Sequence, residues 1–140
     1  MNVDPYRTLL TDLCRALGVA DAAPLHREGR LVVAGTEITL AHERDVQGEH
    51  LWVCVDFGAV PEEHARHVYR AMLEANLRAG GPEGGVLTLQ ASGRATLLVR
   101  HPLTAALGGE LLARVLVEYA SVAEHWISDA WASPPEGSRA

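Results

Sequence analysis

The amino-acid sequence predicts an α+β fold of two layers, in which helices pack on an antiparallel sheet in the order α-β-β-β-α-β-β-α. Segments that alternate apolar and polar residues stand in pairs around short turns, as antiparallel hairpins do. Segments with apolar residues at three- and four-residue spacing stand before, between and after these pairs, as amphipathic helices do. The 140 residues suit a single domain that can bury a core without a disulfide or a metal.

The first helix is predicted to begin after Asp4 as N-cap, with Pro5 at its first position, and to end at Gly18. A loop through Pro24 follows. The apolar line of this helix consists of Tyr6, Leu9, Leu10, Leu13 and Leu17.

Three strands come next. The segments Arg30–Ala34 and Glu37–His42 flank Gly35-Thr36, which predicts a tight hairpin. The strand Leu51–Phe57 extends this hairpin into a meander. Its period of two places Leu51, Val53, Val55 and Phe57 on one face and Trp52, Cys54 and Asp56 on the other.

Gly58 is predicted to end the third strand, and Pro61 suits the first position of a second helix. Glu62 and Glu63 follow, where the helix dipole favours negative charge. The apolar stripe of this helix consists of Ala65, Val68, Tyr69, Met72, Leu73, Asn76 and Leu77.

A glycine-rich turn, Arg78–Gly85, leads to a second predicted hairpin, in which Val86–Ala91 and Ala95–His101 pair across a Ser-Gly turn. The last helix is predicted to start at Thr104 or Gly109 and to end near Ile127. We therefore expect one domain over residues 1–131 and a disordered tail over residues 132–140.

Composition excludes several classes of function. A net charge of −6 argues against a nucleic-acid partner, because such binding depends on neutralising phosphates. No segment has the length and apolarity of a membrane span, and no secretory signal pattern is seen, so a cytoplasmic protein is expected. All twelve basic residues are arginine, which excludes a phosphate-binding loop with lysine and a Schiff-base enzyme. Cys14 and Cys54 are expected to be reduced core thiols.

The sequence offers little catalytic chemistry. His64 and His67 share a helix at a spacing that suits a metal, but no third ligand accompanies them. Asp56 is expected to accept backbone N–H bonds at the strand–helix corner, with Glu43 and Asp45 as the other carboxylates near the sheet. We therefore predict no catalytic residue, no metal and no cofactor.

With its elements in this order, the chain resembles the CesT-like (Tir-chaperone) family of type III secretion chaperones over about Tyr6 to Trp126. The resemblance rests on the Leu-Leu-x-x-Leu pattern of the first helix, the apolar first hairpin, the Phe57-Gly58 corner and the Leu-rich last helix. Its sharpest element is Asn76 in Met-Leu-Glu-Ala-Asn-Leu, a polar amide on an apolar stripe that needs a hydrogen-bond partner if it is buried.

The resemblance implies a non-enzymatic bacterial chaperone that binds the N-terminal segment of a secreted effector as an extended chain, with the secretion ATPase as a second candidate partner. It also implies a homodimer. The residues it implies for effector binding are Leu10, Leu13, Leu31, Val33, Leu40 and Trp52. Those it implies for the dimer interface are Val68, Met72, Leu73, Val86, Leu87 and Leu89.

Two alternatives of other classes stay open at this point. One is a small α+β enzyme or ligand-binding domain that uses Asp56, His42 or His101. The other is an immunity protein that binds a folded toxin.

Overall fold

The computed structural model describes residues 4–78, 84–129 and 131. Its helices and strands follow the predicted order, with one short helix and one 3-10 turn in addition. The elements are α1 (Pro5–Leu17), α2 (Ala23–Glu28), β1 (Arg30–Val33), β2 (Thr36–Asp45), β3 (Gly48–Ala59), η1 (Glu62–His64), α3 (Ala65–Leu77), β4 (Val86–Leu89), β5 (Arg94–Pro102) and α4 (Gly109–Asp129).

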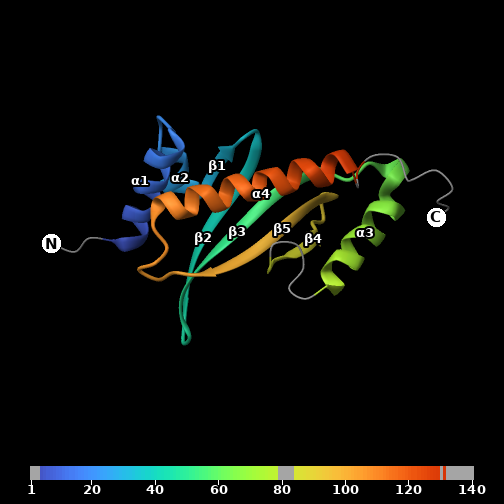
Figure 1. Ribbon diagram of the computed structural model, residues 1–140. Helices are drawn as coiled ribbons and strands as arrows, with labels where there is room; N and C mark the ends of the chain where they lie inside the picture. Colours follow the sequence, from blue (N-terminus) through green and yellow to red (C-terminus); the bar gives the residue numbers. More distant parts are fainter. Residues whose placement is uncertain (1–3, 79–83, 130, 132–140) are drawn as a thin grey trace.

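The five strands form one antiparallel sheet in the order β1-β2-β3-β5-β4. The helix α4 runs across the sheet, α1 and α2 lie at the end near β1, and α3 lies beside β4 (Figure 1). The predicted α+β class and element order are therefore confirmed. In this strand order β1 and β4 are the two edges of the sheet. The strands β3 and β5 are neighbours, although α3 and β4 lie between them in the sequence.

The first helix is capped as predicted. The side chain of Asp4 accepts a hydrogen bond from the Tyr6 N–H at 3.0 Å, and Gly18 ends the helix in the left-handed conformation. The short helix α2 occupies part of the segment for which the sequence predicted a loop.

The first hairpin and the Gly58 corner differ in detail from the prediction. The turn of the first hairpin consists of Ala34 and Gly35, both with positive φ, because a two-residue turn of this hand matches the twist of its strands. Thr36 therefore already belongs to β2. Gly58 does not end β3 but forms a β-bulge with φ 93°, and the strand continues to Ala59.

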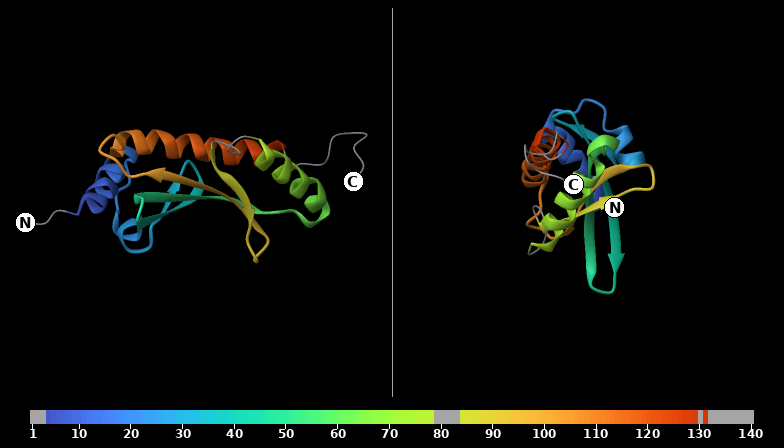
Figure 2. Two further views of the ribbon diagram at one scale, coloured as in Figure 1. Left: turned by 90° about the horizontal axis from the view of Figure 1, so that it is seen from below. Right: turned by 90° about the vertical axis from the view of Figure 1, so that its right-hand side faces the viewer.

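The strands β2 and β3 are also longer than predicted and pair as far as Asp45 and Gly48. We call this extension, residues 43–50, the hairpin arm. Figure 2 shows it extending away from the rest of the molecule. Its residues are mostly charged, so the apolar alternation that predicts strands was absent there. Ladder pairing and an ion pair between Arg44 and Glu49 hold the arm together.

The core lies between α4 and one face of the sheet. The residues of β3 alternate as predicted, because Leu51, Val53, Val55 and Phe57 are at most 1% exposed. Trp52 and Cys54 are half-buried on the opposite face.

The helices α1 and α4 cross in direct contact at Gly109, the first residue of α4. A Cβ atom at this position would lie 2.6 Å from the carbonyl carbon of Asp12 and 2.8 Å from the amide nitrogen of Leu13. Only a glycine therefore lets the two backbones approach this closely.

The aromatic side chain of Trp131 ends the described part of the chain in the core. It is 7% exposed, packs against Phe57 and Trp126, and donates from Nε1 to the Ala59 carbonyl at 3.2 Å. The domain boundary at residue 131 stays a prediction. The predicted tail, residues 132–140, lies outside the described residues.

We expect Gly109→Ala to lower the free energy of unfolding by about 1–3 kcal/mol, because the added methyl group must push apart two helix backbones. Gly108→Ala is the matched control, since a Cβ there meets no atom within 4 Å, and we expect its effect to stay within about 0.5 kcal/mol. Urea unfolding measures both. Equal effects at the two positions would contradict the close crossing.

We also expect a chain ending at Trp131 to be as stable as the full chain to within about 0.5 kcal/mol. A chain ending at residue 130 should lose about 3 kcal/mol or more, because it loses a buried indole and its hydrogen bond. Thermal unfolding of the two truncated chains tests this. A large loss in the longer chain would show that residues 132–140 belong to the domain.

Candidate functional site

The β1 edge of the sheet presents backbone groups that point outward. At the β1 edge, the Leu40 N–H donates to the Gly29 carbonyl at 2.7 Å, so Gly29 pairs with β2. Hydrogen-bonded residues alternate along an antiparallel strand, so Leu31 and Val33 pair with β2 in the same way. The N–H and C=O groups of Arg30 and Val32 therefore point away from the sheet, and the Val32 side chain is 64% exposed.

A groove of about 390 Å³ runs along this edge between β1 and α2. Its apolar lining residues are Val19, Pro24, Leu25, Leu31 and Val32. An open apolar groove beside unpaired strand backbone can receive an extended chain, because the backbone can bond to the edge while alternate side chains enter the groove.

The rim of this groove is acidic. Asp21, Glu28 and Glu37 line it together with one arginine, Arg30. Arg30 bridges two of these carboxylates, with Nη1 3.6 Å from Glu28 and Nη2 3.1 Å from Glu37. The remaining negative charge favours a partner segment that carries basic residues.

Most of the residues implied for effector binding lie inside the core. Leu31 lines the groove, and Trp52 is half-buried on the sheet face opposite the core, with the Arg100 guanidinium 5.8 Å from its ring centre. Five of the six are buried: Leu10 at 3%, Leu13 at 0%, Leu31 at 7%, Val33 at 4% and Leu40 at 3% exposed. The helical and strand patterns predicted apolar positions correctly but not which of them another element covers.

The second candidate surface combines α3 and β4. Of the residues implied for the dimer, Leu73, Val86 and Leu89 are 70%, 53% and 47% exposed, while the other three, Val68, Met72 and Leu87, are buried. Sequence reasoning did not assign Tyr69 and Leu77 to this surface, although they lie four residues on either side of Leu73 and are 38% and 88% exposed. The broad stripe on α3 thus has a buried side and an exposed apolar side.

Asn76, near the end of α3, bonds to the backbone of β4 and so has the hydrogen-bond partner that a buried amide needs. Its Nδ2 donates to the Leu87 carbonyl and its Oδ1 accepts from the Leu87 N–H, both at 2.8 Å. One side chain thereby satisfies both backbone groups of one edge residue.

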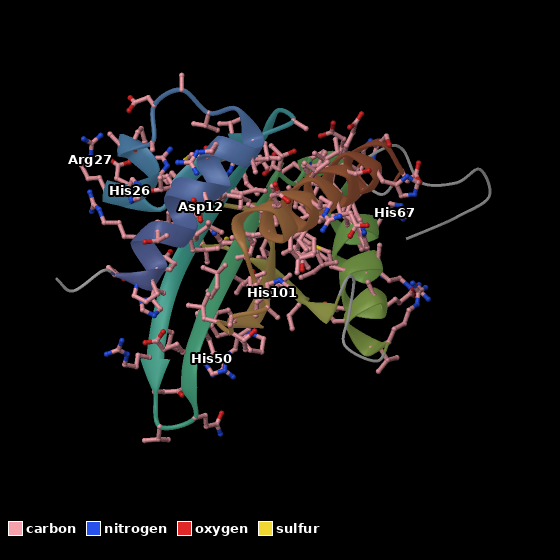
Figure 3. All side chains as sticks on the ribbon, turned by 60° about the vertical axis from the view of Figure 1, so that its left-hand side comes forward. Asp12, His26, Arg27, His50, His67 and His101 are labelled. Atoms are coloured by element: carbon pink, nitrogen blue, oxygen red, sulfur yellow. The ribbon has the colours of Figure 1, made fainter. Side chains whose placement is uncertain are left out.

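The residues of the alternative enzymatic site do not share a pocket. His42 stacks on Tyr6, and His101 bonds to the Tyr119 hydroxyl at 2.8 Å, which places both against the helices. Asp56 lies on the opposite face toward the other end of β3, where it accepts from Arg94 and from the Gly58 N–H. Figure 3 shows His101, His50 and His67 on three separate elements.

These side chains have clear structural roles. Burial opposes ionisation of Asp56, but the hydrogen bonds from Arg94 and Gly58 outweigh it and hold the pKa of this carboxyl below its usual value. Burial lowers the pKa of His101. Within the described residues, Asp56 is thus engaged by Arg94 and His101 by Tyr119.

One group of ligand-type atoms stands on the hairpin arm. Oxygen and nitrogen atoms of Glu43, Asp45 and His50 lie within 4.8 Å of one another. The Nη2 atom of Arg100 lies 3.0 Å from Asp45, 3.1 Å from His50 and 3.4 Å from Glu43. The guanidinium therefore supplies the positive charge that a cation would bring, and we assign no metal there.

Comparison with protein families identifies the chain. The model of the Tir chaperone protein (CesT) family matches residues 8–127. The chain belongs to this family. Membership confirms the expected family and a non-enzymatic chaperone. A search of curated proteins gave no significant match.

Five chains of solved structures match significantly. One comes from the structure of the HopA1–SchA chaperone–effector complex; it is 22% identical with a TM-score of 0.58, and the match covers 91% of this chain and 99% of that chain. At this identity the likeness shows a shared fold. None of the helices in the described residues is both long and apolar enough to cross a membrane.

Proposed function

We propose that this CesT-family protein is a cytoplasmic type III secretion chaperone that holds the N-terminal segment of an effector as an extended chain along the β1 edge. The observation that carries the proposal is the outward-pointing backbone of Arg30 and Val32 beside an apolar groove. Family membership supports the chaperone role, and the groove supports the mode of binding.

The register of β1 defines how such a segment would lie. A residue that pairs with Val32 would exchange two hydrogen bonds with it and turn its side chain to the same face as Val32. The residues before and after it would turn toward the face of Leu31, where Leu25 lines the groove. The segment should therefore carry apolar residues at alternate positions.

The acidic rim adds to this description. Asp21, Glu28 and Glu37 favour arginine or lysine next to the apolar residues of the segment. Charge on the rim mainly speeds association and selects among partners, so the bound segment needs apolar contact for most of its affinity.

The proposal includes a homodimer formed by the exposed apolar surface of α3 and β4. This surface, which we call the α3–β4 patch, consists of Tyr69, Leu73, Leu77, Val86 and Leu89. Exposed apolar side chains on two neighbouring elements are typical of protein–protein contacts. The secretion ATPase is retained as a candidate further partner on the family resemblance alone.

The first test captures partners from the native bacterial lysate with the tagged wild-type protein, Val32→Pro and Val32→Thr. We expect the wild type to retain one secreted protein through its N-terminal region, in a complex with two copies of this chain. Proline lacks the outward N–H of Val32, so Val32→Pro should fold but bind the captured segment at least about tenfold more weakly.

Val32→Thr is the matched control, because threonine keeps the backbone donor and suits a strand. Isothermal titration with the captured N-terminal fragment measures both affinities. Equal binding by Val32→Pro and the wild type would contradict binding at the β1 edge. Capture of a partner that limited proteolysis shows to be folded throughout would favour the immunity-protein alternative.

The dimer is tested with Leu73→Glu. Because Leu73 is 70% exposed, the glutamate leaves the core intact but places an unpaired charge in the α3–β4 patch, so we expect a folded monomer. Val117→Glu on α4, at a side chain that is 47% exposed, is the control and should stay dimeric. Light scattering after size-exclusion chromatography at micromolar concentration measures both.

The neighbouring substitution Met72→Glu should instead unfold or aggregate the chain, since Met72 is 5% exposed and packs in the core. A wild-type protein that is monomeric under these conditions would contradict the dimer itself. A dimer that survives Leu73→Glu would place the contact elsewhere.

A further inference from the structure

Asn76 imitates a neighbouring strand at the β4 edge. At this edge the Gln90 N–H donates to the Arg94 carbonyl at 2.8 Å, so even-numbered residues pair with β5. The backbone groups of Leu87 and Leu89 therefore point away from the sheet. The Asn76 amide gives Leu87 one acceptor and one donor, which is the pattern that a residue of an added antiparallel strand would supply.

Among the described residues, no side chain pairs the β1 edge in the way that Asn76 pairs Leu87. No side chain there bonds to the outward backbone groups of Arg30 or Val32. Each edge is formed by a four-residue strand with two outward residues, and the edges differ because a side chain already pairs one of the two at β4, Leu87.

We propose that Asn76 closes the β4 edge to extended chains, so that each copy of the protein offers a single strand-accepting edge, at β1. The assignment of the β1 edge to the effector rests on the proposed function. The closure of the β4 edge rests on the Asn76–Leu87 pair alone.

The residue type fits this role. An aspartate would set a carboxylate against the Leu87 carbonyl, and a leucine would leave both Leu87 groups unpaired. The side chain also fixes α3 against β4 while leaving Leu73 and Leu77 exposed on α3. Asn76 is therefore a positioning residue that selects between the edges rather than a contact for the effector.

The first readout uses the full-length Leu73→Glu protein, so that a dimer contact cannot protect the β4 edge. Amide hydrogen exchange of this protein, followed by NMR, should show the Leu87 N–H exchanging at least about tenfold more slowly than the Val32 N–H. Both N–H groups point outward from edge strands, and only Leu87 is bonded to a side chain. Equal exchange of the two amides would overturn the proposal.

The second readout uses a labelled peptide that copies Arg94–Pro102, the strand that pairs with β4 in the fold itself. Its binding is followed by fluorescence anisotropy. All proteins carry Leu73→Glu, so that a dimer contact cannot cover the β4 edge. Within that background we compare Val32→Pro, Asn76→Ala, both together, and Glu74→Ala, a control on the exposed side of α3 whose partner is Arg70.

We expect one peptide per chain for the background protein and for Glu74→Ala, none for Val32→Pro, two for Asn76→Ala and one for the double variant. Failure of the double variant to bind would overturn the closure by Asn76. If the background protein binds no peptide while the Asn76→Ala variant binds one, the β1 assignment fails and the closure by Asn76 stands.

Asn76→Gln keeps both amide groups on a longer side chain and should restore slow exchange at Leu87 in part. If Asn76→Ala does not fold, Asn76→Ser takes its place, because serine cannot bridge the N–H and the carbonyl of Leu87 together.

Discussion

The constraint on which this structure depends is that an open sheet has two edges, each with backbone groups that need a partner. At the β4 edge the chain itself meets this need at Leu87, because Asn76 binds both backbone groups of that residue. The β1 edge does not, because Arg30 and Val32 face outward beside a groove. Among the described residues, the fold therefore has one edge that a side chain pairs at Leu87 and one edge whose outward groups no side chain binds.

The core covers only one face of the sheet, so the sheet can stay open and keep two edges. The core needs only one face of β3, with Leu51, Val53 and Val55 fully buried beneath α4. A closed barrel would have removed the edges but would have left no place for a partner strand. The open sheet has its most extensive pairing at the centre, where β3 pairs with β2 and β5, and both proposed binding surfaces lie at its edges.

The sequence predicted the fold where local signals and burial agree. Asp4, Pro5 and Gly18 mark the ends of α1, and the alternation of Leu51 to Phe57 marks the buried face of β3. The hairpin arm is longer than predicted. Its charged residues are held by backbone pairing and not by burial in the core, so they show no apolar alternation that would predict a strand. Asn76 was recognised as an amide in need of a partner, but no sequence pattern could name Leu87, which lies eleven residues away on another element.

The site was less predictable than the fold for a physical reason. Periodicity shows that a residue such as Leu13 or Leu40 faces an apolar environment, but a core and a partner surface are apolar alike. Which one applies depends on whether a third element covers the residue, as α4 covers much of the sheet. On α3, adjacent residues separate in this way, because Met72 is 5% exposed and Leu73 is 70% exposed.

Magnitudes show why the groove must accompany the open edge. Arg30 and Val32 offer two N–H and two C=O groups, and each net hydrogen bond contributes about 0.5–1.5 kcal/mol, or about 2–6 kcal/mol together. Ordering an extended segment costs about 2–5 kcal/mol, so backbone pairing alone roughly cancels that cost. Net affinity must then come from apolar side chains that enter the groove, at about 25 cal/mol per Å² buried. In the proposed binding mode, the edge consequently sets the position and direction of the segment, while apolar contact with the groove sets how tightly it would be held.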